Sequence, residues 1–361
     1  MSDNSNNKKR ALIAMSGGVD SSLAAKLMID AGYDCIGCTM KLYDNEDVGI
    51  SSAHTCCTLD DVEDARRVAH DLSMDHHVFN FKDGFRENVI QRFIDAYEAG
   101  MTPNPCIDCN RYMKFNKLFE RAEILGCDYI VTGHYARIES DGERYYLKRA
   151  LDDTKDQSYV LYSLTQEQLK HVQFPLGSLK KTEVRELAKE CNFINASKPD
   201  SQDICFVPDG KYAEFIERET SKSYKEGNFI DIEGNVLGRH KGVIRYTIGQ
   251  RKGLGIALNE PMYVKEINVK DNTVVLARDK ELYSSELTAN NINLISVDKI
   301  NEPMVVMAKV RYRHEPAEAI VTQISDDEIK VVFKEPQRAI TKGQAVVLYD
   351  KDVVVGGGTI C

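Results

Sequence analysis

The sequence predicts a doubly wound α/β domain with a parallel sheet, followed by two small β-rich domains, the last of them a β-barrel. Short apolar runs alternate with helical patterns up to about residue 210, and a Gly-Gly turn joins the first run to the first helix. Closely spaced alternating runs replace this pattern from about residue 227. A chain of 361 residues also exceeds one ordinary core. We expect domains at 1–208, with a helical extension, 209–278 and 279–361.

The first domain is predicted from its alternating elements. Helices are expected at about 19–31, 59–72, 84–99 and 112–125, where apolar residues recur on one face. Strands are expected at 10–15, 34–40, 77–79 and 128–132. Strands that alternate with helices in this way form a parallel sheet.

The later part of the chain has the pattern of β structure. Strands are expected at 243–248, 262–268, 273–277, 304–311, 317–324, 328–333, 345–349 and 352–355. Asp271-Asn272 separates two of these runs and predicts a hairpin turn. The stretch 165–222 reads as mostly helical and joins the two patterns.

Composition is that of an ordinary soluble protein, with 42% hydrophobic and 29% charged residues. No apolar run approaches the ~20 residues of a membrane span, and the polar N-terminal stretch lacks a signal-peptide pattern. We therefore expect a cytoplasmic protein with no membrane partner.

The net charge of −9 alone argues against a nucleic-acid partner, but the charge is uneven. Residues through Pro208 include 25 basic and 33 acidic side chains, whereas the remainder has 22 and 23. Three stretches, 234–259, 303–314 and 336–344, contain basic residues and no acidic one. This segregation favours contact with phosphates, and solvated basic faces are the alternative.

The segment Ser16–Ser22 follows the first strand and opens the first helix. Two glycines let the backbone approach an anion, and free amides at the helix start favour negative charge. Asp20 could hold the Mg²⁺ that accompanies a nucleotide. The Walker lysine is absent, so the loop is not a Walker loop. An ordinary serine-capped turn is the alternative interpretation.

Ten cysteines in a long chain without a signal sequence indicate chemistry, metal binding or burial rather than disulfides. Prolines in 102–110 predict an extended loop that places Cys109 just before a helix, whose N-terminus would stabilise a thiolate. A zinc site of Cys35, Cys38, Cys106 and Cys109 is disfavoured, because residues three apart on a strand point to opposite faces. By itself, Cys205 reads as a buried structural cysteine, and Cys56-Cys57 suggests no firm role.

Taken together, these segments resemble the tRNA-specific 2-thiouridylase family, within the Rossmann-like PP-loop ATP-pyrophosphatase superfamily. The resemblance spans nearly the whole chain. Its matching strings are SGGVDSS (16–22), TPNPCIDCN (102–110), TGHYAR (132–137), KDQSYVL (155–161), SQDICF (201–206), YTIGQRKGLGI (246–256), RYRH (311–314) and PQRAITKGQ (336–344).

The resemblance implies an enzyme, a tRNA-uridine 2-sulfurtransferase that thiolates C2 of the wobble uridine in the tRNA anticodon arm. ATP adenylates the C2 oxygen, and Cys205 accepts a persulfide from a sulfur-relay donor protein. Cys109 is the nucleophile, and the two cysteines can end as a disulfide. The residues implied for ATP are Ala14, Met15, Ser16, Gly17, Gly18, Val19, Asp20, Ser21, Met40 and Gly133. Those implied for tRNA are Asn104, Pro105, Cys106, His134, Lys155, Asp156, Gln157, Arg311, Tyr312 and Gln344.

Some family members have aspartate at the position of Cys106, so the proton-transfer role assigned there is open in this chain. Cys106, Cys109 and Cys205 could alternatively bind an iron–sulfur cluster. Two other functions remain as alternatives. One is another adenylating synthetase or amidotransferase, which would need neither the cysteine pair nor the basic stretches. The other is an RNA-binding protein with a vestigial nucleotide loop.

Overall fold

The computed structural model describes residues 8–44, 59–199 and 204–361. The chain forms two compact units. The first unit comprises Met1–Val89, Cys106–Asp209 and Asp352–Val354, and the second comprises Ile90–Pro105, Gly210–Lys351 and Val355–Cys361. Cys56 and Cys57, for which no role was predicted, lie outside the described residues.

The first unit contains a five-stranded sheet of order β3-β2-β1-β4-β7, in which every pairing is parallel. Its strands are β1 (Arg10–Ala14), β2 (Asp34–Lys41), β3 (Asp75–Asn80), β4 (Tyr129–Val131) and β7 (Val172–Gln173). The predicted doubly wound α/β fold is therefore confirmed, and the four predicted strands are present with small shifts in their ends.

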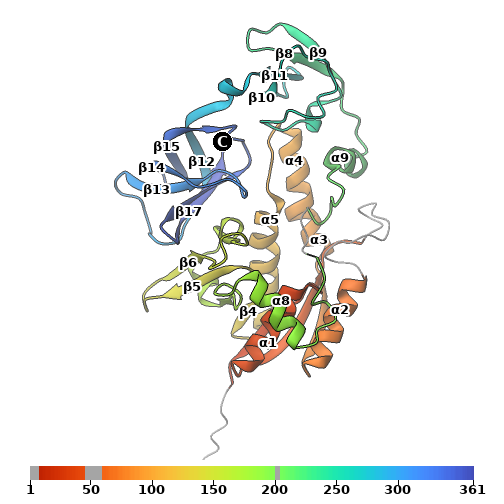
Figure 1. Ribbon diagram of the computed structural model, residues 1–361, viewed down its shortest axis with the longest axis vertical. Coiled ribbons are helices and arrows are strands. Elements are labelled where there is room, and N and C mark those ends of the chain that lie inside the picture. The colour runs from red at the N-terminus through yellow and green to blue at the C-terminus, as the bar shows by residue number, and fades with distance from the viewer. Residues whose placement is uncertain (1–7, 45–58, 200–203) are drawn as a thin grey trace, which may run out of the picture. The chain divides into compact units, whose positions relative to one another are not determined.

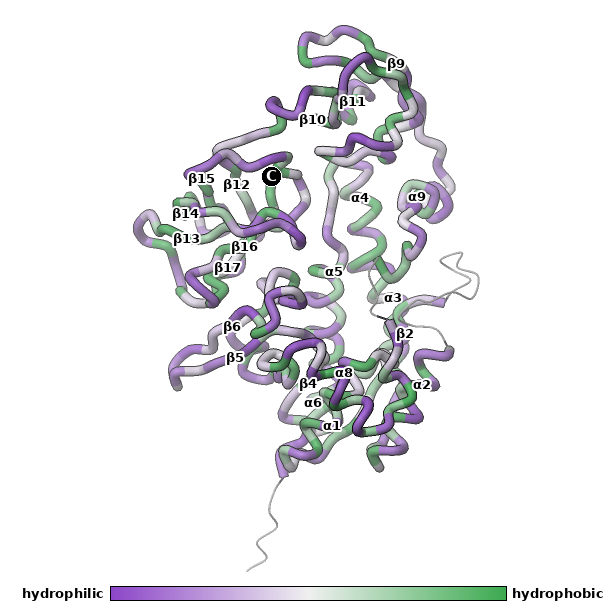
Figure 2. Tube along the Cα trace, viewed as in Figure 1, coloured by the Kyte–Doolittle hydropathy of each residue, from purple (hydrophilic) through white to green (hydrophobic). Residues whose placement is uncertain are grey.

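Burial on both faces explains why β1 is a short, wholly apolar run. Ala11, Leu12 and Ile13 are fully buried. The helices α1 (Val19–Asp30), α2 (Leu59–Asp71) and α8 (Lys181–Glu190) contribute to one core with the sheet (Figure 1). The hydropathy of these elements can be followed along the chain in Figure 2.

Helices also occupy a region where the sequence predicted an extended loop. α5 (Pro105–Asp108), the π-helix η2 (Cys109–Lys117) and α6 (Leu118–Ile124) follow one another without a break. The expectation that the prolines keep 102–110 extended is wrong beyond Asn104, because Pro105 stands at the first helical position. Proline is tolerated there because its missing N–H would have no partner inside the helix. Cys109 therefore lies within the helical run rather than before it.

The chain before residue 171 contains further elements. They are α3 (Lys82–Phe85), which continues into the π-helix η1 (Arg86–Gln91), the antiparallel pair β5 (Ala136–Ser140) and β6 (Tyr145–Arg149), the 3₁₀-helix η3 (Ser158–Leu161) and α7 (Gln166–Lys170). The stretch 165–222 was predicted to be mostly helical, and its helices α7, α8 and α9 (Tyr212–Thr220) are separated by irregular segments.

The second unit contains α4 (Arg92–Glu98), α9 and a four-stranded sheet of order β10-β11-β8-β9. These strands are β8 (Gly227–Ile230), β9 (Val236–His240), β10 (Tyr263–Asn268) and β11 (Thr273–Ala277). The predicted hairpin turn is confirmed, since β10 and β11 are antiparallel and Asn272 has a φ of 51°. The predicted strand at 243–248 is wrong, because Val243–Arg245 forms the 3₁₀-helix η4.

The last part of the second unit is a closed barrel, as predicted. Its strands are β12 (Tyr283–Leu294), β13 (Met304–Lys309), β14 (Ala317–Ser325), β15 (Glu328–Arg338), β16 (Ala345–Asp350) and β17 (Val353–Ile360). They run in the order β12-β15-β14-β13-β16-β17, and the pairing of β12 with β17 closes the barrel. Among the helices of the described residues, none has the length and apolar character needed to cross a membrane.

A steric test of the first unit uses Gly177. A Cβ on Gly177 would lie 1.8 Å from the carbonyl oxygen of Ala136, which is backbone and cannot move aside cheaply. Gly177→Ala should reduce the free energy of unfolding by about 1–3 kcal/mol. Gly84→Ala is the matched control, because its Cβ would make only a 3.4 Å contact with Met113. Thermal unfolding should show a lower Tm for the first variant alone, and equal Tm values would contradict the packing.

Candidate active site

The loop between β1 and α1 has the geometry of a phosphate-binding turn. Gly17 has a φ of 72°, and a Cβ there would lie 2.3 Å from the carbonyl oxygen of Asp61. The Ser16 amide donates to Ser21 Oγ over 3.2 Å, and that hydroxyl donates to the Gly18 carbonyl over 3.0 Å. These bonds hold the turn closely against the first turn of α1, whose amides face outward from the helix start.

Segments that are distant in sequence meet at this loop. Met15 donates its amide to the Cys38 carbonyl over 2.7 Å, which ties the loop to β2 two residues before Met40. A Cβ on Gly133 would lie 2.8 Å from Ser21 N, so the residues after β4 pass directly over the loop. The sheet order changes direction at β1 and β4. Ligands of open α/β sheets bind at such a point, beyond the carboxyl ends of the strands.

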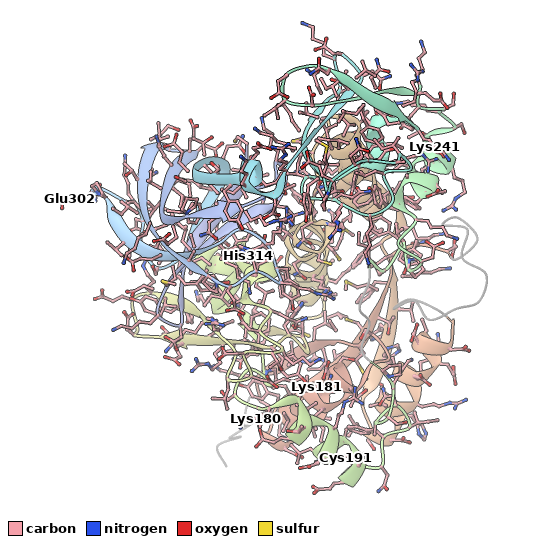
Figure 3. All side chains as sticks on the ribbon, turned by 45° about the horizontal axis from the view of Figure 1, so that its top comes forward. Lys180, Lys181, Cys191, Lys241, Glu302 and His314 are labelled. Atoms are coloured by element: carbon pink, nitrogen blue, oxygen red, sulfur yellow. The ribbon has the colours of Figure 1, made fainter. Side chains whose placement is uncertain are left out.

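Asp20, the expected magnesium ligand, is already engaged by protein groups. Lys181 Nζ lies 2.7 and 2.8 Å from the two carboxylate oxygens, and the Tyr135 hydroxyl donates to one of them over 2.7 Å. Lys181 is a buried residue at the start of α8, next to the exposed Lys180 (Figure 3). A remote helix therefore supplies a positive charge to a loop whose own sequence lacks the Walker lysine.

The segment Lys155–Gln157 is linked to this ion pair through Tyr135, whose hydroxyl contacts Asp20. Gln157 exchanges two hydrogen bonds with the backbone of Tyr135, through its amide and its Oε1. The buried Asp156 accepts from the Ala150 amide over 3.0 Å and from the Ser158 hydroxyl over 2.8 Å. These inward contacts order the turn that holds Tyr135, and through Tyr135 they position Asp20.

Two further residues that the sequence analysis missed hold the Gly17 carbonyl. Asn195 Nδ2 donates to it over 2.9 Å and to Ser22 Oγ over 2.9 Å. Lys198 Nζ lies 3.4 Å from the same carbonyl and pairs with Asp61 and Asp64. Burial alone would lower the pKa of Lys198, but the two carboxylates outweigh it and raise the pKa.

His134 was expected to reach the target base, but its side chain is buried. Its Nδ1 lies 2.6 Å from Thr132 Oγ1 and its Nε2 lies 3.4 Å from Lys114 Nζ. Phe115 and Phe174 pack against the ring. Burial, reinforced by the Lys114 charge, holds the pKa of His134 well below its ordinary value. The neutral ring is suited to accept a hydrogen bond from Lys114.

The cysteine helix, comprising α5 and η2, presents Cys106 as an exposed residue and Cys109 as a half-buried one. Residues three apart lie on neighbouring positions of one helical face. Further along the same run, the Met113 side chain lies near Gly84 of α3, so the cysteine helix packs on α3.

Cys205 lies on a tight turn that is anchored to the same region. The amide of Val207 donates to the Ile204 carbonyl over 2.8 Å, and the buried Tyr43 donates its hydroxyl to the Cys205 carbonyl over 2.7 Å. Phe85 of α3 packs against both Tyr43 and Phe206, with ring centroids 5.9 and 5.7 Å apart. The turn with Cys205 and the cysteine helix therefore share α3 as a packing partner.

The structure does not gather a metal site from these cysteines. Cys109 and Cys205 are not in a disulfide, and within the ranges that the structure covers no three His, Cys, Asp or Glu side chains are grouped to hold a metal ion. Cys106, Cys109 and Cys205 are thus not arranged as cluster ligands. Cys35 and Cys38 lie on β2 as predicted, and burial raises the pKa of Cys35 to about 11 and also raises that of Cys38.

The remaining residues implied for tRNA belong to the second unit. Asn104 and Pro105 end the segment that leads into the cysteine helix. Arg311 and Gln344 donate to backbone carbonyls of that unit, and Tyr312 packs under the ammonium of Lys309.

Three family models match the chain in succession. The tRNA methyl transferase HUP domain matches residues 9–209, the tRNA methyl transferase PRC-barrel domain residues 213–278, and the aminomethyltransferase beta-barrel domain residues 284–360. The fold and the loop thus define a nucleotide-binding protein of the HUP class with two appended β domains.

Curated relatives specify the family. The chain is 52% identical over 354 residues to tRNA-specific 2-thiouridylase MnmA of Clostridioides difficile (strain 630), covering 98% of both chains. It is 52% identical over 356 residues to the protein of that name from Acetivibrio thermocellus, covering 98% of this chain and 99% of the relative. The chain belongs to the tRNA-specific 2-thiouridylase family. A solved 4-thiouridine synthetase–RNA complex with bound ATP aligns with 22% identity and a TM-score of 0.38, over 59% of this chain and 50% of that one, and adds no argument.

The buried His134 predicts a pH dependence of stability. Because its pKa is depressed in the folded chain, its contribution is complete above about pH 6.5. That contribution is lost as the pH falls further, because the unfolded chain binds a proton that the folded chain does not. His134→Gln should flatten the decline of unfolding free energy below pH 6.5 by up to about 1.4 kcal/mol per pH unit. Unfolding curves from pH 7.5 to 5.5 measure this slope. His70→Gln, at an exposed position on α2, should keep the wild-type slope, and an unchanged slope in His134→Gln would refute the assignment.

Proposed function

We propose that this chain uses ATP to replace the C2 oxygen of the wobble uridine in tRNA with sulfur, as a tRNA-uridine 2-sulfurtransferase. The observation that supports this most directly is in the first unit, where the phosphate-binding turn and two cysteine-bearing segments belong to one compact unit. We propose three working parts. Residues 1–208 bind ATP and carry out the chemistry, and 209–278 and 279–361 grip the anticodon arm. The proposed setting is the cytoplasm.

ATP would bind along the turn from Ala14 to Ser21, with adenine near Met40 and Gly133. Three features fit a nucleotide there: the missing Cβ of Gly17, the amides at the start of α1 and the Lys181 charge. Bound Mg²⁺ would offset phosphate charge, and Asp20 would hold it by exchanging part of its contact with Lys181 for the metal. A uridine oxygen is a poor leaving group, whereas AMP is a good one, so adenylation must come before sulfur delivery.

Sulfur delivery then needs two thiols. In this proposal, Cys205 accepts a persulfide from a donor protein, and its terminal sulfur attacks C2 while AMP leaves with the oxygen. The Cys109 thiolate attacks the Cys205 sulfur and breaks the persulfide S–S bond. The products are 2-thiouridine and a Cys109–Cys205 disulfide, which a thiol reductant must reopen before the next turnover. Cys106 would contact the target nucleotide from the exposed face of the helix.

We propose that the acid-free stretches bind RNA phosphates. The structure makes one of their basic residues, Arg245, a poor candidate for this contact. Arg245 pairs with Glu214 and Glu217 at 2.9 and 2.7 Å, so its charge is already balanced. Lys241, Arg251 and Lys252 are exposed in the same stretch and remain the better phosphate contacts.

Because Cys109 and Cys205 are proposed to act only in sulfur transfer, their variants should block sulfur transfer and leave adenylation intact. Cys109→Ser and Cys205→Ser should each lower 2-thiouridine formation by about 10³-fold or more, because sulfur cannot be transferred or released. Both variants should still release pyrophosphate from ATP in the presence of tRNA. Mass spectrometry of digested tRNA and a pyrophosphate assay measure the two steps. Cys361→Ser is the control and should behave as wild type.

Three results would contradict the proposal. A Cys109→Ser variant that kept full ATP-dependent activity would favour another adenylating enzyme, and absence of tRNA-stimulated pyrophosphate release in the wild type would leave an RNA-binding protein. Unchanged 2-thio content at the wobble uridine in a strain lacking the protein would refute the substrate.

The Asp20–Lys181 pair predicts a defect in the first half-reaction. Lys181→Met leaves the Asp20 carboxylate without its cation and removes a charge from the nucleotide site, so pyrophosphate release should fall about 10- to 100-fold. Lys180→Met changes the neighbouring exposed lysine and should have little effect. Initial rates of pyrophosphate release at saturating tRNA measure both variants, and a wild-type rate for Lys181→Met would exclude this role.

A further inference from the structure

Lys114 of the cysteine helix is a half-buried lysine whose charge is not balanced by a carboxylate. Its Nζ lies 3.4 Å from His134 Nε2, and no ion pair joins it to an acidic side chain within residues 8–44, 59–199 and 204–361. Two other lysines contact the nucleotide turn, Lys181 and Lys198, and both have carboxylate partners. Lys114 therefore has a positive charge that is available to an anion.

The group that contacts Lys114 is a neutral imidazole held in one orientation. Burial keeps the pKa of His134 well below its ordinary value. Its Nδ1 lies 2.6 Å from the hydroxyl of the buried Thr132, and Phe115 and Phe174 pack against the ring. A ring proton on Nδ1 is donated to Thr132, which leaves the Nε2 lone pair for Lys114. A neutral acceptor orients the ammonium without cancelling its charge, and an ammonium has two further N–H groups to offer a ligand.

The place of Lys114 near the nucleotide turn follows from the residue before His134. A Cβ on Gly133 would lie 2.8 Å from Ser21 N and 3.0 Å from Asp20 Cβ, so Gly133 contacts the turn directly. His134 is the next residue in the chain, and its ring contacts Lys114. All of these residues belong to the first unit. The ammonium therefore lies where the cysteine helix approaches the segment that covers the nucleotide turn.

The π-helical winding of η2 places Lys114 on the side of Cys109. Hydrogen bonds in a π-helix join residues five apart, so Lys114 lies one turn beyond Cys109. In an α-helix, two residues five apart are separated by about 140° around the axis. π-Helical turns inside helical runs are rare and occur frequently at functional sites. Here the winding brings an ammonium and a thiol to one side of the helix.

Two side-chain contacts anchor this helix within the first unit. The buried Asn110 donates to a backbone carbonyl of η3 over 2.9 Å, and Gln168 Nε2 of α7 donates to the Phe115 carbonyl over 2.7 Å. Asn110 directly follows Cys109, and Phe115 directly follows Lys114. The backbone is therefore fixed next to the thiol and next to the ammonium.

We propose that Lys114, oriented by His134, binds the phosphate of the adenylated uridine and stabilises the charge that this phosphate gains when AMP leaves. This inference rests on the proposed function and adds a catalytic residue for its second step. In that step the terminal sulfur of the Cys205 persulfide forms a bond to C2, and the C2–O bond breaks. The electron pair of the broken bond stays on the oxygen of AMP, whose phosphate changes from one negative charge to about two.

This gain in charge separates the two half-reactions. The α-phosphate has a single negative charge in ATP and again in the adenylated uridine, so Lys114 binds both states about equally. The charge rises only as AMP leaves, and Lys114 then stabilises the transition state more than the ground state. Lys181 differs, because it pairs with Asp20 at the turn and is predicted to support pyrophosphate release.

The test compares Lys114→Gln with Lys117→Gln in the full-length protein. Glutamine keeps an N–H group for His134 and removes the charge. Lys117 lies in the same helix but pairs with Glu120 over 2.9 Å, so its variant is the matched control. Protein loaded with sulfur by inorganic polysulfide is mixed with ATP and a tRNA transcript. Single-turnover 2-thiouridine formation, pyrophosphate release and retention of α-phosphate label on the tRNA are then measured.

Lys114→Gln should lower the rate of 2-thiouridine formation about 10²-fold, because one charge-stabilising donor is lost. Pyrophosphate release should stay within about threefold of wild type, which also verifies the fold, and label from the α-phosphate should accumulate on the tRNA. Lys114→Arg keeps the charge and should recover about a tenth of the wild-type rate. Lys117→Gln should match wild type in all three measurements.

The outcomes separate this inference from the proposed function. If Lys114→Gln lowers pyrophosphate release as much as thiolation, the lysine acts in adenylation and the inference is wrong. It is also wrong if Lys114→Gln thiolates at the wild-type rate, or if Lys114→Arg is no faster than Lys114→Gln. Failure of the wild type to release pyrophosphate or to thiolate tRNA would refute the proposed function instead.

Discussion

The nucleotide end of the first unit depends on the contacts that the Asp20 carboxylate makes with both Lys181 and Tyr135. This carboxylate joins the start of α1 to the start of α8 through Lys181, and to the segment after β4 through Tyr135. Gln157 in turn fixes the Tyr135 backbone. A buried charge is tolerated only when it is paired and hydrogen-bonded, and breaking one side of such a pair is costly. The three segments therefore keep a single arrangement around the turn, and the turn can present its amides without a ligand to order them.

Local patterns were enough to predict the sheet and the turn, because β1, Gly17 and α1 are consecutive in the chain. The same reasoning failed where one residue type permits two structures. Pro105 was read as a helix breaker, but it starts the cysteine helix, and the apolar run at 243–248 is a 3₁₀ turn with irregular flanks. Strand β12 was missed because its sequence, YSSELTANNINL, has few apolar residues. The sequence could not predict the roles of Lys181, Asn195 and Lys198. These residues contact partners that are 161 to 181 residues away in the sequence, and no local pattern marks them.

The family resemblance identified residues that are expected to contact tRNA, and the structure shows which protein groups lie next to them. Asp156, Gln157 and His134 all turn toward the protein interior or backbone, where they contact the Ala150 amide, the Tyr135 amide and the Lys114 ammonium. Three residues for which the resemblance implies contact with tRNA are thus engaged with protein groups in this structure. By contrast, Lys241 and Lys252 are exposed.

Closure of the barrel has a consequence for how the protein is made. The loop at 342–344 bonds to Ile360 in strand β17, so it cannot take its final shape while that strand is still inside the ribosome. The α/β sheet, whose strands end at residue 173, can fold much earlier during synthesis. Closure of the barrel is therefore one of the last steps of folding, and a product that ends before β17 would keep the α/β sheet while lacking the strand that pairs with β12.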